Sequence, residues 1–312
     1  MHLFRGFRHC RTDDRGVAVA IGNFDGVHLG HQALVRTARD RAAASGARLA
    51  VLTFEPHPRE FLEPAAAPPR LMRLGEKCAA LGALGVEQLV VLRFDARLQH
   101  LTADLFVERV LRQGLGARHV VVGEGFRFGS RRAGTIETLT AAGASGGFEV
   151  VTVPSVLADG ARVSSTRVRE ALARGDLGAA ARLLGRPYAL TGRVIFGRQL
   201  GRRLGYATAN LRLHRRVAPL GGVFAVRVRG IDGRPAAAAV ASLGTRPTVG
   251  GGETLLEVHV FDFDGDLYGR RLAVDFVAKL RDEEKFPSLE ALVQQMNADA
   301  ARAREILAAR AA

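Results

Sequence analysis

The pattern of apolar residues changes once along the chain, and this change constrains the fold more than any other feature. Up to about residue 184, short apolar runs alternate with segments of helical spacing such as 31–45 and 103–113; the runs are VAVAIG, RLAVLTF, EQLVVL, RHVVVG and FEVVTV. Continuous Val-rich runs are typical of parallel strands buried on both faces. We therefore expect an α/β N-terminal domain with a doubly wound parallel sheet.

Beyond residue 188, apolar runs follow one another without long helices between them: ALTGRVIF, GGVFAVRVR, AAAAVASLG, TLLEVHVF and RLAVDFVAKL. Gly, Asp and Pro turns separate them, which favours an antiparallel sheet, most simply a small β-barrel. The last stretch, from Ser288, has helical periodicity. We place the boundary near Gly185 to Tyr188, which gives domains 1–185 and 186–312.

Composition narrows the class of protein. The 312 residues are 47% hydrophobic and 24% charged, which suits two globular domains. Cys10 and Cys78 are too few for a disulfide framework and lack the paired spacing of a zinc site. The first residues have no apolar core of a signal peptide, and no later segment resembles a membrane span. We expect a cytoplasmic protein with no membrane association.

The net charge of +14 raises nucleic acid as a partner. Lys77, Lys279 and Lys285 are the only lysines, so the excess is almost wholly arginine, and the arginines are scattered along the chain. Scattered charge is typical of a solvated surface. We expect no nucleic-acid partner, while small polyphosphate substrates remain compatible with the charge.

The first chemical motif, GNFDGVHLGHQ, directly follows the run VAVAIG. Gly22, Gly26 and Gly30 let the backbone approach a ligand, and His28 and His31 open the next helix. Amide donors and two imidazoles can stabilise charge on a phosphoryl group during displacement. The alternatives are a zinc site or a chance pair of surface histidines. The flanking glycines and the strand-to-helix context oppose both, no Glu lies between the histidines, and no Cys is nearby.

A second motif, VSSTRVREAL, places Ser164, Ser165 and Thr166 at a helix start, with Arg167 and Arg169 in the first turn. Hydroxyls, amides and guanidinium groups at such a place can hold the phosphates of ATP. Taken alone, the segment is better read as an ordinary N-cap of an amphipathic helix.

Together the two motifs resemble the HxGH nucleotidyltransferase superfamily, with its Rossmann-like fold, and in particular the adenylyltransferase half of bacterial riboflavin kinase/FAD synthetases. The resemblance implies that His28 and His31 are catalytic and stabilise the transferring α-phosphate of ATP. FMN would attack, giving FAD and diphosphate. The residues that would bind ATP are Gly22, Asn23, Phe24, Gly26, Gly30, Ser164, Ser165, Thr166 and Arg169.

Two further segments resemble the flavin site of this family. TFEPHPREFL supplies Phe54 and Pro56, and GEGFRFG supplies Phe126 and Phe128, whose rings are suited to stacking on an isoalloxazine. The family commonly has Asp or Asn where this chain has Gly125.

In the C-terminal part, TGRVIFGRQLGRRLGYATAN resembles the Gly-rich opening and the PTAN motif of riboflavin kinases. Taken alone, such glycines are more often β-turns. By the resemblance, Thr208 and Asn210 bind Mg²⁺ between nucleotide phosphates, for which their oxygen atoms are suited. Ala207 stands where the family has proline. The residues of an ATP-wrapping loop would be Gly192, Gly197, Gly201, Gly205, Thr208 and Asn210.

LLEVHVFDFDGDLYG also resembles the kinase family and makes Glu257 the candidate base for the riboflavin 5′-hydroxyl. Without the family, an outward-facing strand residue is the simpler reading of Glu257. Arg281, in KLRDEEKFP, is the candidate flavin-site contact, and Ser242 stands where Asn is usual. We thus expect a bifunctional enzyme that makes FMN and then FAD from riboflavin, ATP and Mg²⁺. The alternatives are one active module, or a flavin- or RNA-binding protein built on inactive domains.

Overall fold

The computed structural model describes residues 1–197, 206–215, 217–233, 235–246 and 253–309. The chain forms two compact units. The first comprises Met1–Pro68 and Met72–Ser164, and the second comprises Pro69–Leu71 and Ser165–Ala312. None of the helices in these described ranges is both long and apolar enough to cross a membrane.

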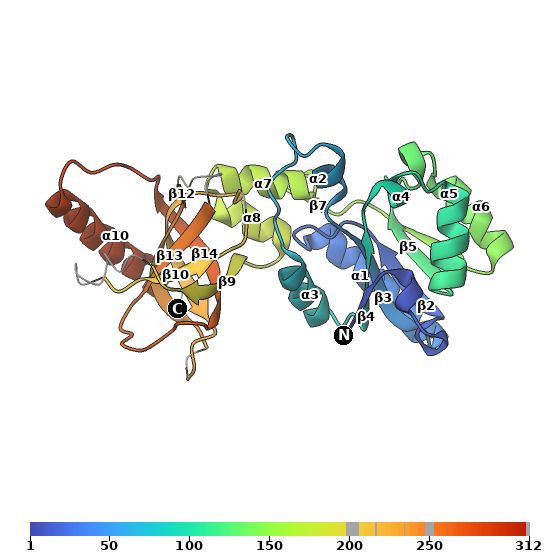
Figure 1. Ribbon diagram of the computed structural model, residues 1–312, viewed down its shortest axis with the longest axis horizontal. Helices are drawn as coiled ribbons and strands as arrows, with labels where there is room; N and C mark the ends of the chain where they lie inside the picture. The colour runs from blue at the N-terminus through green and yellow to red at the C-terminus, as the bar shows by residue number, and fades with distance from the viewer. Residues whose placement is uncertain (198–205, 216, 234, 247–252, 310–312) are drawn as a thin grey trace. The chain divides into compact units, whose positions relative to one another are not determined.

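A six-stranded sheet, all of its pairs parallel, forms the centre of the first unit (Figure 1). Its spatial order is β1-β4-β3-β2-β5-β6. This confirms the predicted doubly wound domain, although the short edge strand β1 was not predicted. The strands are β1 (His2–Arg5), β2 (Val17–Ile21), β3 (Arg48–Glu55), β4 (Gln88–Arg93), β5 (His119–Gly123) and β6 (Glu149–Val153).

Helices connect these strands, as the spacing of segments 31–45 and 103–113 predicts. The second of these segments begins as α5 (Ala103–Phe106) and continues as the π-helix η3 (Val107–Gly114). The other elements of the unit are η1 (Phe7–His9), η2 (Thr12–Asp14), α1 (Leu29–Ser45), α2 (Pro58–Leu62), α3 (Leu74–Ala83), α4 (Ala96–Gln99), η4 (Ser130–Arg132), α6 (Ile136–Gly146) and the hairpin β7 (Leu157–Ala158) and β8 (Ala161–Arg162).

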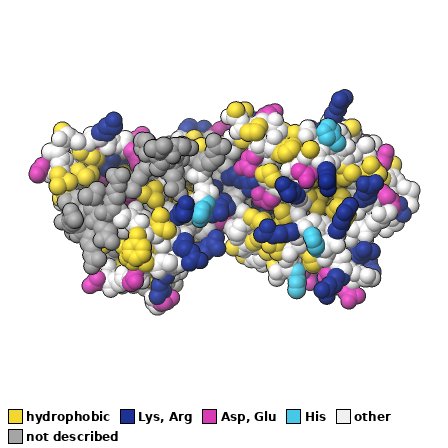
Figure 2. Space-filling view, in the orientation of Figure 1, with side chains coloured by type: hydrophobic (Ala, Val, Ile, Leu, Met, Phe, Trp, Pro, Cys, Tyr) yellow, Lys and Arg dark blue, Asp and Glu magenta, His cyan; other side chains and the backbone are white. Residues whose placement is uncertain are grey.

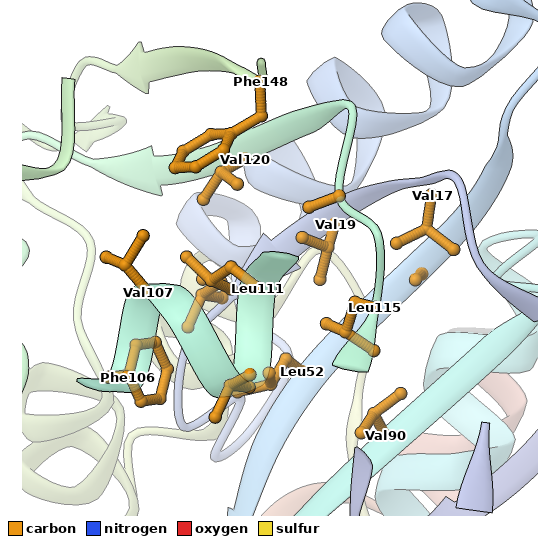
Figure 3. Packing of buried hydrophobic residues seen from close by; sticks show 14 of the residues in the cluster. Val17, Val19, Leu52, Val90, Phe106, Val107, Leu111, Leu115, Val120 and Phe148 are labelled. Atoms are coloured by element: carbon orange, nitrogen blue, oxygen red, sulfur yellow. The ribbon is translucent and has the colours of Figure 1, made fainter. Parts of the chain in front are cut away.

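Strand β2 has both of its faces in the core. Val17 and Val19 pack in one apolar cluster with Leu111 and Leu115, part of which Figure 3 shows. Ala18 and its neighbours on the opposite face belong to a second cluster, which includes side chains of α1 and α3. Alternate residues of a strand point to opposite faces, so a strand between two layers is apolar throughout. All five residues of β2 are accordingly buried.

The second unit contains a closed six-stranded barrel in which every strand pair is antiparallel, as predicted. Helix α10 packs on the outside of the barrel through Ala300, Ala303 and Leu307, which contact Val223 and Val240. The elements are α7 (Ser165–Ala173), α8 (Leu177–Leu184), β9 (Tyr188–Ile195), β10 (Ala209–Arg212), β11 (Gly222–Arg229), β12 (Ala237–Arg246), β13 (Glu253–Val260), β14 (Arg271–Arg281) and α10 (Leu289–Ala309).

Helices α7 and α8 belong to the second unit, whereas the predicted N-terminal domain 1–185 includes them. Helix α8 contacts β9 and β14 of the barrel. A compact structural unit and a catalytic domain need not end at the same residue. The functional boundary at residue 185 therefore stays a prediction.

The core of the first unit provides a test of the fold. Leu111 is fully buried between η3 and the sheet, so Leu111→Ala should lower the free energy of unfolding by about 2–5 kcal/mol. Leu105, in the preceding turn, is 38% exposed, and Leu105→Ala should change it by about 0.5 kcal/mol or less. Urea denaturation followed by circular dichroism measures both. Equal effects of the two variants would contradict the packing described.

Candidate active sites

The turn between β2 and α1 carries the first motif and has an unusual backbone. Gly26 has a φ of +93°, and two residues with side chains, Phe24 (+49°) and Val27 (+44°), also lie in the left-handed region. Non-glycine residues adopt this conformation at a cost, and such turns gather at functional sites. Phe24 and Val27 are buried, and this packing holds the turn in shape. The N-terminus of the 17-residue helix α1 follows directly.

His28 and His31 lie side by side at this helix N-terminus. Their rings stack with centroids 3.7 Å apart, and Nδ1 of His28 accepts a hydrogen bond from the backbone N–H of His31 at 3.3 Å. Because that nitrogen accepts, the ring proton of a neutral His28 lies on Nε2. A Cβ placed on Gly30 would lie 3.2 Å from Cε1 of His28, so glycine makes room for the ring.

His31 is held in the neutral form. Burial above all, then His28 and the ammonium group of Lys77, lower the pKa of His31 well below its ordinary value of 6.5. Its Nδ1 is buried and has no hydrogen-bond partner among the described residues. Two stacked imidazoles at a helix N-terminus, of which His31 is held neutral, can donate hydrogen bonds to an anion.

A cavity of about 1100 Å³ borders the same turn. It brings together predicted residues from three segments, Gly22, Asn23, Phe54, Phe126 and Phe128. The last two rings are nearly parallel, with centroids 5.6 Å apart. Pro56 is not among the residues that line the cavity. This aromatic wall has the size and chemistry for a flat heteroaromatic ligand.

The sequence analysis missed other parts of this cavity. Phe94 adds a ring that lies edge-on to Phe54, at 6.2 Å, and Arg59, Arg127 and Arg132 line the wall with basic groups. Phe94 directly follows the strand β4, so a search for rings just beyond the carboxyl ends of parallel strands would have found it.

Gly125 also lines this cavity, and the backbone there tolerates a side chain. A Cβ at Gly125 would meet nothing closer than Nη1 of Arg162, at 3.6 Å, which is ordinary contact. His57, expected to be structural, accepts a hydrogen bond from the backbone N–H of Arg59 as the N-cap of α2, and it also lines the cavity.

Val163, which directly precedes Ser164, lies close to the histidine turn. A Cβ on Gly30 would lie 3.7 Å from the carbonyl oxygen of Val163, so the two motif segments are close at this point. Ser165, Thr166 and Arg169 belong to α7 of the second unit, where Nε of Arg169 donates to the carbonyl of Pro69 at 2.7 Å. Their contact with a nucleotide stays a prediction.

The second motif set surrounds a cavity of about 410 Å³ on the barrel. Three of its predicted residues, Gly197, Thr208 and Asn210, line it. Gly197 lies so close to the Asn210 amide that a Cβ would collide with it. The amide nitrogen of Asn210 donates to the Thr208 carbonyl at 3.5 Å, which directs Oδ1 away from that carbonyl. Asp264, Asp266 and Tyr268 also line the cavity and were not predicted.

Not every glycine of the kinase motif lies in a loop. Gly192 was expected in the ATP-wrapping loop, but it lies inside strand β9, opposite Leu272. A Cβ there would approach Cβ of Leu211 to 2.9 Å, so its glycine allows β9 and β10 to come close. The loop placement of Gly192 is therefore wrong. Gly201 and Gly205 lie outside the described residues.

Glu257 lies on β13, directly opposite Asn210 of β10 and Ser242 of β12. Residues directly opposite in antiparallel strands share a face, so the side chains of Glu257 and Asn210 lie on the same face of the sheet. Glu257 does not itself line the cavity next to Asn210. Ser242, in place of the usual Asn, donates a hydrogen bond of 3.3 Å to Glu283.

Arg281 ends strand β14 and forms an ion pair with Asp299 of α10. Its Nε lies 3.0 and 3.1 Å from the two carboxylate oxygens, and its Nη2 lies 2.9 Å from Oδ2. Asp299 is 7% exposed, so this pair ties α10 to the barrel. The predicted flavin contact of Arg281 stays a prediction beside this structural role.

The tandem order of the sites agrees with known protein families. A family described as FAD synthetase matches residues 10–167, and one described as riboflavin kinase matches residues 184–307. A bifunctional riboflavin kinase/FMN adenylyltransferase of Pseudomonas fluorescens is 50% identical over 99% of this chain and 98% of the relative. The protein of the same name from Escherichia coli K12 is 42% identical over 98% and 97%.

Among solved structures, a Streptococcus pneumoniae protein described as a macrolide-efflux protein is 34% identical, with a TM-score of 0.82 over 97% of this chain and 98% of that one. This similarity supports the fold along the whole chain. The two matching family models describe FAD synthetase and riboflavin kinase, and neither describes efflux. The relatives from P. fluorescens and E. coli match over nearly their full length. The chain therefore belongs to the family of bifunctional riboflavin kinase/FMN adenylyltransferase enzymes.

Proposed function

We propose that the histidine turn of the first unit carries out adenylyl transfer and that the barrel cavity of the second unit carries out phosphorylation of riboflavin. The observation that carries this assignment is that each unit has its own cavity beside a glycine-constrained backbone. ATP is the co-substrate of both reactions, and the functional domains would be 1–185 and 186–312.

In adenylyl transfer, a phosphate oxygen of FMN attacks the α-phosphorus of ATP, the bond to the bridging oxygen breaks, and diphosphate leaves. His28 donates from Nε2, and neutral His31 donates from its protonated ring nitrogen, to the charge that develops on the α-phosphate. The turn and the start of α7 would hold the nucleotide through Gly22, Asn23, Phe24, Gly26, Gly30, Ser164, Ser165, Thr166 and Arg169. Phe54, Pro56, Phe126 and Phe128 would hold the flavin.

In the kinase reaction, the riboflavin 5′-hydroxyl attacks the γ-phosphorus of ATP, ADP leaves, and Glu257 accepts the hydroxyl proton. Gly197, Gly201 and Gly205 would allow the backbone to approach ATP, and Gly192 would contribute only through the close packing of β9 and β10. Arg281 would contact the flavin side of the site from the end of β14.

The residues of the barrel cavity fit Mg²⁺. Thr208 and Asn210 offer a hydroxyl and an amide oxygen, which are hard donors, and the hydrogen bond from Asn210 to the Thr208 carbonyl orients the amide. When bound, the ion would offset the charge of the nucleotide phosphates.

The surface charge favours small anionic substrates, and the free cysteines favour a reducing compartment. Figure 2 shows Lys and Arg side chains spread over the visible face with Asp and Glu among them. Such mixed charge favours ATP and FMN over nucleic acid as partners. Both cysteines, Cys10 and Cys78, are free, which favours the cytoplasm.

The kinase assignment is tested by Glu257→Gln. Without a carboxylate to accept the proton, FMN formation from riboflavin should fall by about 10²–10⁴-fold, while FAD formation from supplied FMN should persist. Chromatographic separation of the flavins measures both rates in one sample. Unchanged FMN formation would remove Glu257 as the base. Wild-type protein that makes FMN without FAD would contradict the bifunctional assignment.

The adenylyl-transfer assignment is tested by His28→Asn and His31→Asn. Each variant should lower the rate of FAD formation from FMN by about 10²–10³-fold, because a preorganised donor to the transition state is lost or displaced. The kinase reaction of the same protein is the control for folding. FAD formation at the wild-type rate in both variants would refute the assignment.

The cavity wall at Gly125 provides a gain-of-affinity test. The space beside Arg162 admits a side chain, so Gly125→Asn should fold normally and place a new hydrogen-bonding amide at the cavity. We expect the KM for FMN to fall by about 2- to 10-fold, the range for one added hydrogen bond. Gly125→Ala is the matched control and should change the KM little. A KM that rises equally in both variants would show that residue 125 acts by size alone.

A further inference from the structure

A buried lysine lies beneath the histidine turn and has no role in the chemistry assigned above. Lys77 comes from α3, and only 2% of its surface is exposed. A charged ammonium group is expensive to bury unless its three protons all find acceptors. The cost of burying Lys77 is therefore offset only if its hydrogen bonds and its charge stabilise the groups around it.

Three acceptors for Lys77 come from the turn and from strand β3. Its Nζ donates to the backbone carbonyl of Asn23 at 2.9 Å, to Oγ1 of Thr53 at 3.3 Å and to Oε1 of Glu55 at 3.3 Å. The Thr53 hydroxyl also donates to the Asn23 carbonyl, at 3.1 Å. One carbonyl of the turn thus receives two hydrogen bonds from the protein interior.

These bonds fix the peptide that joins Asn23 to Phe24. The carbonyl and the N–H of a trans peptide point in opposite directions, so a carbonyl held toward Lys77 directs the Phe24 N–H away from it. Phe24 has a φ of +49°, a conformation that a residue with a side chain avoids in a free chain. The aromatic ring of Phe24 lies 5.0 Å from the ring of His31, so the same residue also supports that histidine.

The charge of Lys77 also affects the histidine turn. Together with burial and His28, it lowers the pKa of His31. A buried cation next to the turn also favours the binding of an anion there.

We propose that Lys77 is a positioning residue for adenylyl transfer, which fixes the Asn23–Phe24 peptide and so presents the turn and His31 to the nucleotide. This inference rests on the proposed role of the histidine turn. The competing explanation is that Lys77 serves only as the ion-pair partner of Glu55.

Two variants separate these explanations. Lys77→Met keeps the length of the side chain but removes the charge and all three donors. We expect kcat for FAD formation to fall by about 10- to 100-fold, the range for loss of a charge-assisted hydrogen bond, with a smaller change in the KM for FMN. Glu55→Gln keeps an acceptor for Lys77 and leaves the bonds to Asn23 and Thr53, so its kcat should stay within about threefold of wild type.

A third variant covers the case in which Lys77→Met does not fold. Thr53→Val is nearly isosteric and removes the other donor to the Asn23 carbonyl, so it should lower kcat for FAD formation by about 3- to 10-fold. The riboflavin kinase rate of each variant is the internal control, and the titration of His31, followed by NMR, should shift toward a higher pKa in Lys77→Met.

The outcomes are distinct. Wild-type kcat in Lys77→Met, or equal losses in Lys77→Met and Glu55→Gln, would overturn the positioning role. If Lys77→Met does not fold, wild-type kcat in Thr53→Val would overturn it. His28→Asn and His31→Asn, measured beside them, separate a failure of this inference from a failure of the proposed function. If both variants keep wild-type FAD formation, the histidine turn is not the site of adenylyl transfer, and if either loses it, only the role of Lys77 is wrong.

Discussion

The first unit depends on a constraint at the end of β2. Because β2 is buried on both faces, its last residue, Ile21, lies in the interior, and the chain must turn there before α1 begins at Leu29. Backbone groups in such a turn need partners, since water cannot reach them all. The buried carboxylate of Asp25 accepts from the backbone N–H of Met72 at 2.9 Å, and Lys77 and Thr53 donate to the Asn23 carbonyl. Polar side chains from the protein interior therefore hold the histidine turn in place.

The sequence predicted the layers of this molecule well, because burial leaves a periodic signal. Each strand between two helical layers reads as an apolar run, and the barrel strands follow one another with turn residues between them. Strand β1 escaped prediction because HLFR has no such run, and its pairing with β4 makes it a strand. Strand β10 escaped it for a related reason, since it is four residues long and overlaps the TAN motif.

The candidate sites were predicted less completely, because their residues meet through the fold. His28 and His31 share one helix turn, so their spacing shows in the sequence. Lys77 reaches partners 54, 24 and 22 residues away, and no local pattern connects them. Lysine is rare in this chain, with three in total, and this rarity distinguishes Lys77 in the sequence. Its burial follows from the packing of α3 on the sheet, which the sequence alone does not show. Gly192 shows the opposite error, in which a motif position was assigned to a loop although strand packing accounts for its glycine.

The replacement of proline by Ala207 illustrates how packing can stand in for a local constraint. Proline restricts φ and so reduces the freedom of a loop before any ligand binds. Here Nδ1 of His259, on β13, donates a hydrogen bond to the Ala207 carbonyl at 2.9 Å. The hydroxyl of Tyr206 donates a hydrogen bond to Oδ1 of Asn297 in α10. Since a carbonyl only accepts, that nitrogen of His259 carries the proton. His259 is two residues from Glu257 on the same face of β13, so the strand that carries the proposed base also restrains the segment that carries Thr208 and Asn210.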